Sequence, residues 1–162
     1  MQRVFEIFKG AVEKYFESKK CQLKPAFLKE VFKRRPWVGR HLFGILLQSS
    51  ANAKYDYRRV EALELMSEVL KTVLAESAPD ESKKFLKGHL SQLGHLVKEL
   101  ATHMPEKQSR RAEVRKFCSK VFQILSSHNL GKSLLKTLDT DARAACESHL
   151  GEQFLALKKT EN

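Results

Sequence analysis

Apolar residues recur at intervals of three or four positions along almost the whole chain. This spacing places them on one side of an α-helix, whereas strict alternation, which would indicate a strand, is not sustained in any stretch. Pro25, Pro36 and the sequence SSANAK at residues 49–54 separate the apolar runs. The pattern therefore predicts an all-α protein.

Seven to eight helices are expected from these runs. Their approximate ranges are 1–20, 25–34, 36–48, 55–75, 79–103, 109–128, 132–138 and 139–157. Pro25 and Pro36 suit the first turns of their helices, because proline lacks the N–H group that is unsatisfied there. Asn129-Leu130-Gly131 can end the sixth long run in a left-handed turn, and Asp139 or Thr140 can cap the last helix.

Two of these helices show which side should be buried. The helix at the start of the chain is expected to bury an apolar face that consists of Val4, Phe5, Phe8, Val12, Tyr15 and Phe16. The helix at 55–75 should place Glu61, Glu64 and Glu68 on a solvated polar face.

Successive helices pair at about 40 residues per pair, with short connections that make neighbours antiparallel. This spacing resembles that of armadillo and HEAT arrays, in which each repeat buries part of its apolar surface against the next. The sequence predicts a short armadillo/HEAT-like α-solenoid segment; an irregular helical bundle is the alternative. We expect a single helical-repeat domain over 1–158 and a frayed tail at 159–162.

The composition is that of a soluble globular domain in a reducing compartment. The chain has 162 residues, 42% of them hydrophobic, and only seven glycines and four prolines. Its cysteines, Cys21, Cys118 and Cys146, are odd in number and widely spaced, and two of them lie within amphipathic patterns. The first twenty residues lack the apolar core of a signal peptide, and no segment reaches the roughly 18 apolar residues of a membrane span.

The net charge of +11 is concentrated at the two ends of the sequence. Residues 1–59 hold 14 basic and 5 acidic side chains, residues 60–105 hold 5 and 7, and residues 106–162 hold 11 and 7. Uneven charge of this kind favours electropositive surfaces that bind nucleic acid or an acidic partner.

One candidate surface lies in the sequence RRAEVRKFCSK, residues 110–120. On a helix, Val114, Phe117, Cys118, Val121, Ile124 and Leu125 fall within about 80° of one direction and form the core face. The basic side chains nearby are candidates for phosphate contact or simply for a solvated helix face: Arg110, Arg111, Arg115, Lys116 and Lys120.

The second candidate surface lies in FKRRPWVGRH, residues 32–41, where Lys33, Arg34, Arg35 and Arg40 surround a proline-started helix. Trp37 can stack on a base here, but a lone tryptophan in a first helical turn is more often a packing residue. Together with Lys19-Lys20, the basic triplet also resembles a loose bipartite nuclear import signal.

No enzymatic or metal site is expected. LGKS at residues 130–133 lacks the earlier glycine and the preceding strand of a phosphate-binding loop. Cys146 and His149 have helical ligand spacing, but two ligands do not make a metal site. No nucleophile signature surrounds any serine or cysteine, so neither catalysis nor a cofactor is predicted.

Three strings near the end of the sequence, RRAEVRKFCSK, SSHNLGKSLLKTL and ACESHLGEQFLALK, resemble the carboxyl-side helical-repeat region of the Myb-binding protein 1A family, which includes DNA polymerase V (phi). The likeness is clearest over residues 107–158. It implies an armadillo-like α-solenoid in nuclear and nucleolar proteins that bind transcription factors and support ribosome biogenesis. Members of the family are much longer, so this chain is expected to be a fragment or a diverged form. The polymerase activity does not transfer, because no strand-borne carboxylate pair for two metals is present.

These observations predict a non-enzymatic interaction domain in the nucleus and nucleolus. Its expected partners are transcription factors or ribosome-biogenesis proteins, and RNA or DNA through phosphate contacts, without a membrane. Two alternatives remain: a direct RNA-binding module, whose two basic ends would join into one stripe, and a pure protein scaffold, whose partner would occupy an apolar groove or the Glu-bearing middle.

Overall fold

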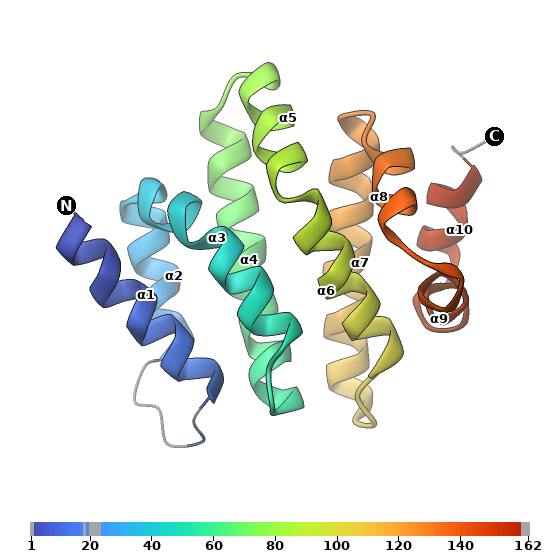
Figure 1. Cartoon of the computed structure of the whole chain (residues 1–162), viewed down its shortest axis with the longest axis horizontal. Helices are drawn as coiled ribbons and strands as arrows, with labels where there is room; N and C mark the ends of the chain where they lie inside the picture. Colours follow the sequence, from blue (N-terminus) through green and yellow to red (C-terminus); the bar gives the residue numbers. More distant parts are fainter. Residues whose placement is uncertain (1, 18, 20–23, 160–162) are drawn as a thin grey trace. The chain divides into compact units, whose positions relative to one another are not determined.

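The computed structural model describes residues 2–17, 19 and 24–159. These residues form helices without any strand, which confirms the all-α prediction (Figure 1). The ten helices are α1 (Gln2–Glu17), α2 (Pro25–Arg34), α3 (Pro36–Ala51), α4 (Asp56–Glu76), α5 (Pro79–Gly88), α6 (Leu90–Thr102), α7 (Gln108–Ser127), α8 (Gly131–Thr137), α9 (Thr140–Leu150) and α10 (Glu152–Lys159). Residues 160–162 of the predicted frayed tail lie outside the described part of the chain.

The number of helices is higher than predicted because two of the expected helices are each broken once. The run at 79–103 divides into α5 and α6 at His89, whose backbone has φ −111° and ψ 6°. The run at 139–157 divides into α9 and α10 at Gly151, which has φ 68° and ψ −144°. This second conformation is essentially restricted to glycine, because a Cβ atom would clash with the backbone.

The contacts within the chain divide it into two compact units, Met1–Ala78 and Pro79–Asn162. Each unit has its own buried apolar side chains and is described by itself. The prediction that residues 1–158 act as one domain stays a prediction, as does the choice between a solenoid and a bundle.

In the first unit, α3 packs against α1, α2 and α4, and α2 also packs against α4. Because α3 has neighbours on several sides, it is buried over a broad face: Val38, Gly39, Leu42, Phe43, Leu46, Leu47, Ser50 and Ala51. In α1, Val12, Tyr15 and Phe16 are buried as predicted, but Val4 is exposed. Phe5 and Phe8 are half-buried.

The predicted glutamate face of α4 contacts neighbouring helices. The Tyr15 hydroxyl donates to Glu61 at 2.8 Å, and the Lys29 ammonium donates to Glu64 at 2.6 Å. Glu68 is only 9% exposed, so the prediction of a fully solvated stripe was wrong at this position. Packing of α2 and α3 on α4 extends the buried side beyond the width that the apolar pattern indicates.

In the second unit, α6 packs against α8 and α9, while α7 and α10 each contact α8, α9 and one another. Cys118 and Cys146 are free thiols within this core, where they act as small apolar residues as predicted. Burial raises the pKa of both, that of Cys146 to about 12. Cys21 lies outside the described residues.

Two predicted helix-end signals are confirmed in this unit. Asn129 adopts φ 59°, and the N–H groups of Asn129 and Leu130 donate to the carbonyls of Ser126 and Leu125, which ends α7 in a Schellman motif. The Asp139 carboxylate caps α9 by accepting from the Ala142 N–H at 2.8 Å, and also lies 3.2 Å from the Lys98 ammonium. These two interactions hold the pKa of Asp139 below its usual value.

A glycine allows α6 and α8 to approach closely. A Cβ atom added to Gly94 would lie 2.0 Å from Thr137 Oγ1 and 2.9 Å from Thr137 Cβ, distances that real Cβ contacts do not reach. Either the helices separate or the threonine moves, and both disturb the packing of the second unit.

We predict that Gly94→Ala lowers the free energy of unfolding by about 1–3 kcal/mol because of this overlap. Urea denaturation followed by circular dichroism measures the change. Gly88→Ala is the matched control, since nothing lies within 4 Å of its added Cβ. Thr137→Ala should restore part of the loss in the double variant; strictly additive effects would contradict the assigned contact.

Candidate interaction surfaces

The first basic surface lies at the joint between α2 and α3 and consists of Lys33, Arg34, Arg35 and Arg40, as the sequence predicted. All four side chains are exposed. Pro25 and Pro36 start the two helices, so the last turn of α2 and the first turns of α3 present these cations within eight residues. We call this group the α2–α3 basic surface.

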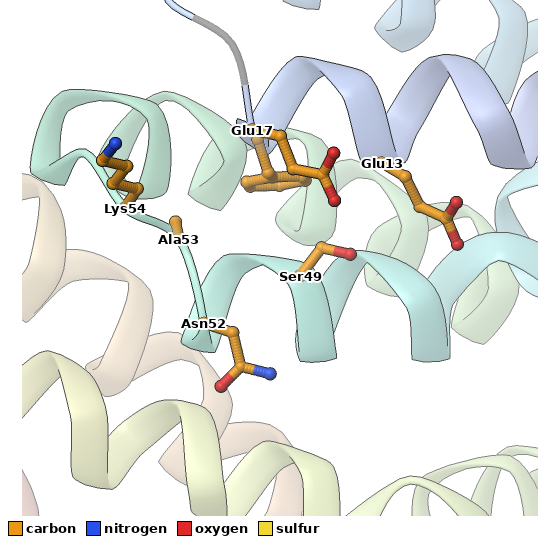
Figure 2. Close-up of a pocket in the computed structure, with 7 residues that line it drawn as sticks. Glu13, Glu17, Ser49, Asn52, Ala53 and Lys54 are labelled. Atoms are coloured by element: carbon orange, nitrogen blue, oxygen red, sulfur yellow. The ribbon is translucent and has the colours of Figure 1, made fainter.

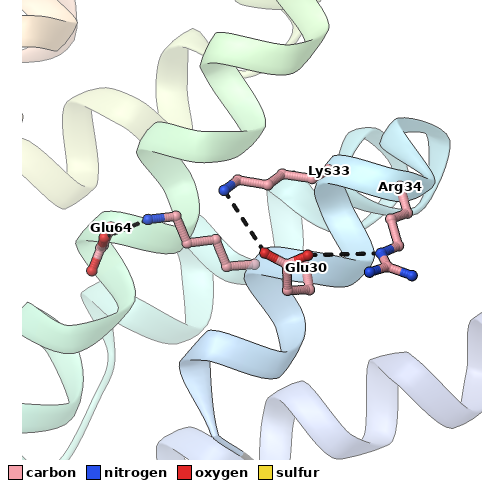
Figure 3. A network of polar contacts seen from close by, with 5 residues as sticks. Glu30, Lys33, Arg34 and Glu64 are labelled. Atoms are coloured by element: carbon pink, nitrogen blue, oxygen red, sulfur yellow. Dashed lines mark hydrogen bonds and ion pairs between the residues drawn. The ribbon is translucent and has the colours of Figure 1, made fainter.

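The Glu30 carboxylate partly neutralises two cations of the α2–α3 basic surface, Lys33 and Arg34. Glu30 lies 3.8 Å from the Lys33 ammonium and 3.7 Å from Arg34 Nε, one turn away on the same helix (Figure 3). Arg35 instead donates to the backbone carbonyl of Arg34 at 2.9 Å. Ion pairs that are long and exposed contribute little to stability, so Lys33 and Arg34 remain available to a partner.

Trp37 is half-buried beside this surface and contacts His41, with ring centroids 6.2 Å apart in an edge-on arrangement. The His41 ring also contacts Phe5 of α1 at 6.3 Å, and its Nδ1 atom lies 2.8 Å from the Trp37 carbonyl. The tryptophan thus belongs to an internal aromatic group, in agreement with the packing interpretation.

The second basic surface lies on α7 and consists of Arg110, Arg111, Arg115, Lys116 and Lys120. The predicted core face of this helix is confirmed, with its apolar side chains buried except for Ile124, which is half-buried. We call the five cations the α7 basic surface.

Two arginines of the α7 basic surface have structural partners. Arg111 Nε donates to the Pro105 carbonyl at 2.6 Å, and Arg115 Nε donates to the His149 carbonyl at 3.0 Å. The His149 carbonyl belongs to the last turn of α9, where a positive charge is favourable. Within the described part of the chain, Arg110, Lys116 and Lys120 have no acidic partner within 4 Å.

The structure also shows a group that sequence reasoning missed, formed by Lys19, Lys54, Tyr55, Tyr57 and Arg58. We call it the tyrosine cluster. The rings of Tyr55 and Tyr57 stack with centroids 5.8 Å apart and planes 26° apart. The ammonium groups of Lys19 and Lys54 lie 4.9 and 5.6 Å from the centre of the Tyr55 ring. The sequence AKYDYRR, in which cations flank two aromatic residues, was the available signal.

Arg58 fixes the tyrosine cluster to the first unit. Its guanidinium lies 4.7 Å from the Tyr15 ring centre and 5.3 Å from that of Tyr57. It also donates to the Lys19 carbonyl at 3.1 Å and to Glu61 at 3.5 Å. Burial, and secondly the hydrogen bond to Glu61, raise the pKa of Tyr15 well above its ordinary value.

Shallow pockets among the described residues are further candidate sites. One has a volume of about 230 Å³ between the ends of α1 and α3, where it is lined by Glu13, Phe16, Glu17, Ser49, Asn52, Ala53 and Lys54 (Figure 2). Another, about 360 Å³, lies between α7 and α10 and is lined by Phe122, Gln123, Ser126, Gln153, Ala156 and Leu157. Among the described residues, no three His, Cys, Asp or Glu side chains gather in a way that could hold a metal ion.

Within each unit, helices pack against their neighbours with short connections, as helices do in helical-repeat proteins. Residues 1–159 match the family described as Myb-binding protein 1A-like, TPR repeats, and the chain therefore belongs to this family. This confirms the resemblance noted near the end of the sequence and extends it over almost the whole chain. No curated protein and no solved structure shows significant similarity to the chain. No helix within the described ranges combines the length and apolar character needed to cross a membrane.

We predict that Glu30→Gln strengthens binding of duplex DNA about two- to fivefold at about 50 mM salt, because it releases Lys33 and Arg34 for phosphate contact. Fluorescence anisotropy of a labelled duplex measures the change. Glu76→Gln is the matched control: it removes the same charge from an exposed position in the same unit. Equal strengthening by both variants would show that net charge alone is responsible.

Proposed function

We propose that this chain is a non-enzymatic interaction domain of the nucleus and nucleolus, whose basic surfaces contact the phosphates or carboxylates of acidic partners. Its partners would be transcription factors or ribosome-biogenesis proteins, with RNA or DNA bound through the backbone. Its role would lie in transcription regulation and ribosome biogenesis.

The observation that carries this proposal is the shortage of internal partners for exposed cations. On the α2–α3 basic surface, Lys33 and Arg34 share the single carboxylate of Glu30 at 3.7–3.8 Å. On the α7 basic surface, three of five cations have no acidic partner among the described residues. Exposed charges that the fold does not use raise its electrostatic potential and attract negatively charged partners.

Membership of the family supports the protein-partner part of the proposal. The family's name refers to a protein that binds Myb, and TPR-type helical repeats generally bind other proteins and are generally non-enzymatic. Each unit exposes helix faces of the kind that helical repeats use for binding. Cations that contact phosphates fix the position of a nucleic acid without reading its bases, so little sequence preference is expected.

A protein scaffold remains the second candidate because of the groove between α7 and α10. Phe122, Ala156 and Leu157 give this groove apolar surface, three polar but uncharged residues complete its lining, and Leu155 on α10 is exposed outside it. An amphipathic helix of a partner could place its apolar face in such a groove. The idea that the two basic surfaces form one continuous stripe stays a prediction, since they belong to different units.

We expect two charge-removal variants to weaken binding of duplex DNA and of polyglutamate, and to lower the slope of log affinity against log salt by up to about one per lost contact. The first changes Lys33, Arg34, Arg35 and Arg40 to Gln. The second changes Arg110, Lys116 and Lys120 to Gln. It leaves Arg111 and Arg115 unchanged, because these two side chains donate hydrogen bonds to backbone carbonyls. Fluorescence anisotropy between about 50 and 200 mM salt provides both quantities.

Changing Lys83, Lys84 and Lys87 of α5 to Gln provides the matched control, since it removes three charges outside both surfaces. Binding that survives at the higher salt and falls only in the first two variants supports the proposal. Equal losses in the control would overturn it, as would wild-type binding that disappears at the higher salt, and the groove between α7 and α10 would become the first place to seek a partner.

A further inference from the structure

The tyrosine cluster combines two aromatic rings with two exposed ammonium groups near the start of α4. Tyr55 precedes the helix in an extended conformation, with φ −117° and ψ 126°, and Tyr57 lies in its first turn. Because the backbone changes direction between them, the side chains of Tyr55 and Tyr57 stack on one another. In a continuous helix, side chains two residues apart would point to opposite sides. Both tyrosines are half-buried, and the side chains that lie over the Tyr55 ring, Lys19 and Lys54, are themselves exposed, so a base can displace them from it.

The cluster is held in place before any partner arrives. Arg58 contacts the ring of Tyr57 and is anchored by Glu61 and by the Lys19 carbonyl. Arg59 donates to the carbonyls of Ser50 and Ala53 at 3.0 Å, which fixes the turn that precedes Tyr55. A preformed site loses little conformational entropy on binding.

The charge around the rings is positive. Asp56, which lies between the two tyrosines, is 3.6 Å from the Arg59 guanidinium, and Glu61 is occupied by Arg58 and Tyr15. Lys19 and Lys54 have no acidic partner within 4 Å among the described residues. Glu13 and Glu17 line the adjoining pocket, but their carboxylates point away from the Lys54 ammonium (Figure 2).

We infer that the tyrosine cluster binds single-stranded nucleic acid: a base stacks on Tyr55 in place of the exposed ammonium groups of Lys19 and Lys54, which turn to the phosphates, while Tyr57 supports the Tyr55 ring from its stacked position. Aromatic side chains stack on any base, and neighbouring cations follow the backbone, so the combination suits a single strand of any sequence. A duplex hides the faces of its bases, and an acidic peptide would engage the cations but leave the rings without a role. This inference goes beyond the proposed function. In the proposed function the cations contact phosphates or carboxylates, whereas here the tyrosine cluster also recognises the bases.

The test is fluorescence anisotropy with a labelled single-stranded oligonucleotide of about ten nucleotides, in RNA and DNA forms. We expect Tyr55→Ala and Tyr57→Ala to weaken binding about tenfold without changing the salt slope, because no phosphate contact is lost. Tyr55→Phe should bind as the wild type, because the ring is retained. Lys19→Ala and Lys54→Ala should each lower the slope by about one.

Phe27→Ala is the matched aromatic control, since this ring is 57% exposed on α2 in the same unit. Lys71→Ala on α4 is the matched charge control. Circular dichroism shows whether each variant is folded. If an alanine variant is not, Tyr55→Leu keeps the test decisive, because it retains apolar bulk but removes the aromatic face and should also weaken binding. Wild-type affinity in both alanine variants would overturn the inference, as would equally effective competition by polyglutamate at the same ionic strength. If only the two basic surfaces prove necessary, the inference fails while the proposed function stands.

Discussion

Helix ends are the main constraint on this structure, because each helix leaves up to four backbone carbonyls without an intrahelical partner at its C-terminus. Because the described part of the chain is divided into many helices, this problem recurs at each helix end, and arginine side chains meet part of it. The guanidinium groups donate to carbonyls at or just beyond helix ends, as in the pairs Arg59 with Ser50 and Ala53, Arg58 with Lys19, Arg111 with Pro105, Arg115 with His149, and Arg143 with Leu135 and Leu138. A planar guanidinium suits this task, since it offers several donors in fixed directions.

These hydrogen bonds distinguish two kinds of cation: arginines that stabilise the fold by donating to backbone carbonyls, and exposed cations that are available to a partner. Arg58 and Arg59 are more than nine-tenths buried; Arg59 holds the turn between α3 and α4 in position, and Arg58 donates to the Lys19 carbonyl just beyond α1. Lys116 and Lys120, in contrast, extend from α7 without an acidic partner in the described part of the chain. The tyrosine cluster combines both kinds, because buried Arg58 orients the rings while exposed Lys19 and Lys54 remain accessible. Those cations of the basic surfaces that make no such backbone contact can therefore serve binding without being required for folding.

The sequence predicted those features that depend on neighbouring residues. Pro25 and Pro36 marked the starts of α2 and α3, Asn129 the end of α7, and Asp139 the cap of α9, because each signal acts within one turn. The breaks at His89 and Gly151 were missed, since the apolar spacing continues through both positions and conceals a local change of backbone direction.

Contacts between residues that are far apart in the sequence could not be predicted from the sequence alone. Whether Arg115 is a surface cation or a helix cap depends on the His149 carbonyl, 34 residues away. Burial of Glu68 depends on how α2 and α3 pack on α4. The tyrosine cluster requires the end of α1 to approach the start of α4, which the spacing of AKYDYRR does not reveal.

The most direct test of the claim that the exposed cations are not needed for folding is the salt dependence of stability. Urea unfolding at neutral pH is followed by Trp37 fluorescence, which reports on the first unit, and by circular dichroism, which reports on both. Unpaired like charges repel one another, so screening between about 50 and 200 mM sodium chloride should raise the unfolding midpoint. A midpoint that falls over the same range would show that the cations stabilise the fold through ion pairs, and would contradict the account.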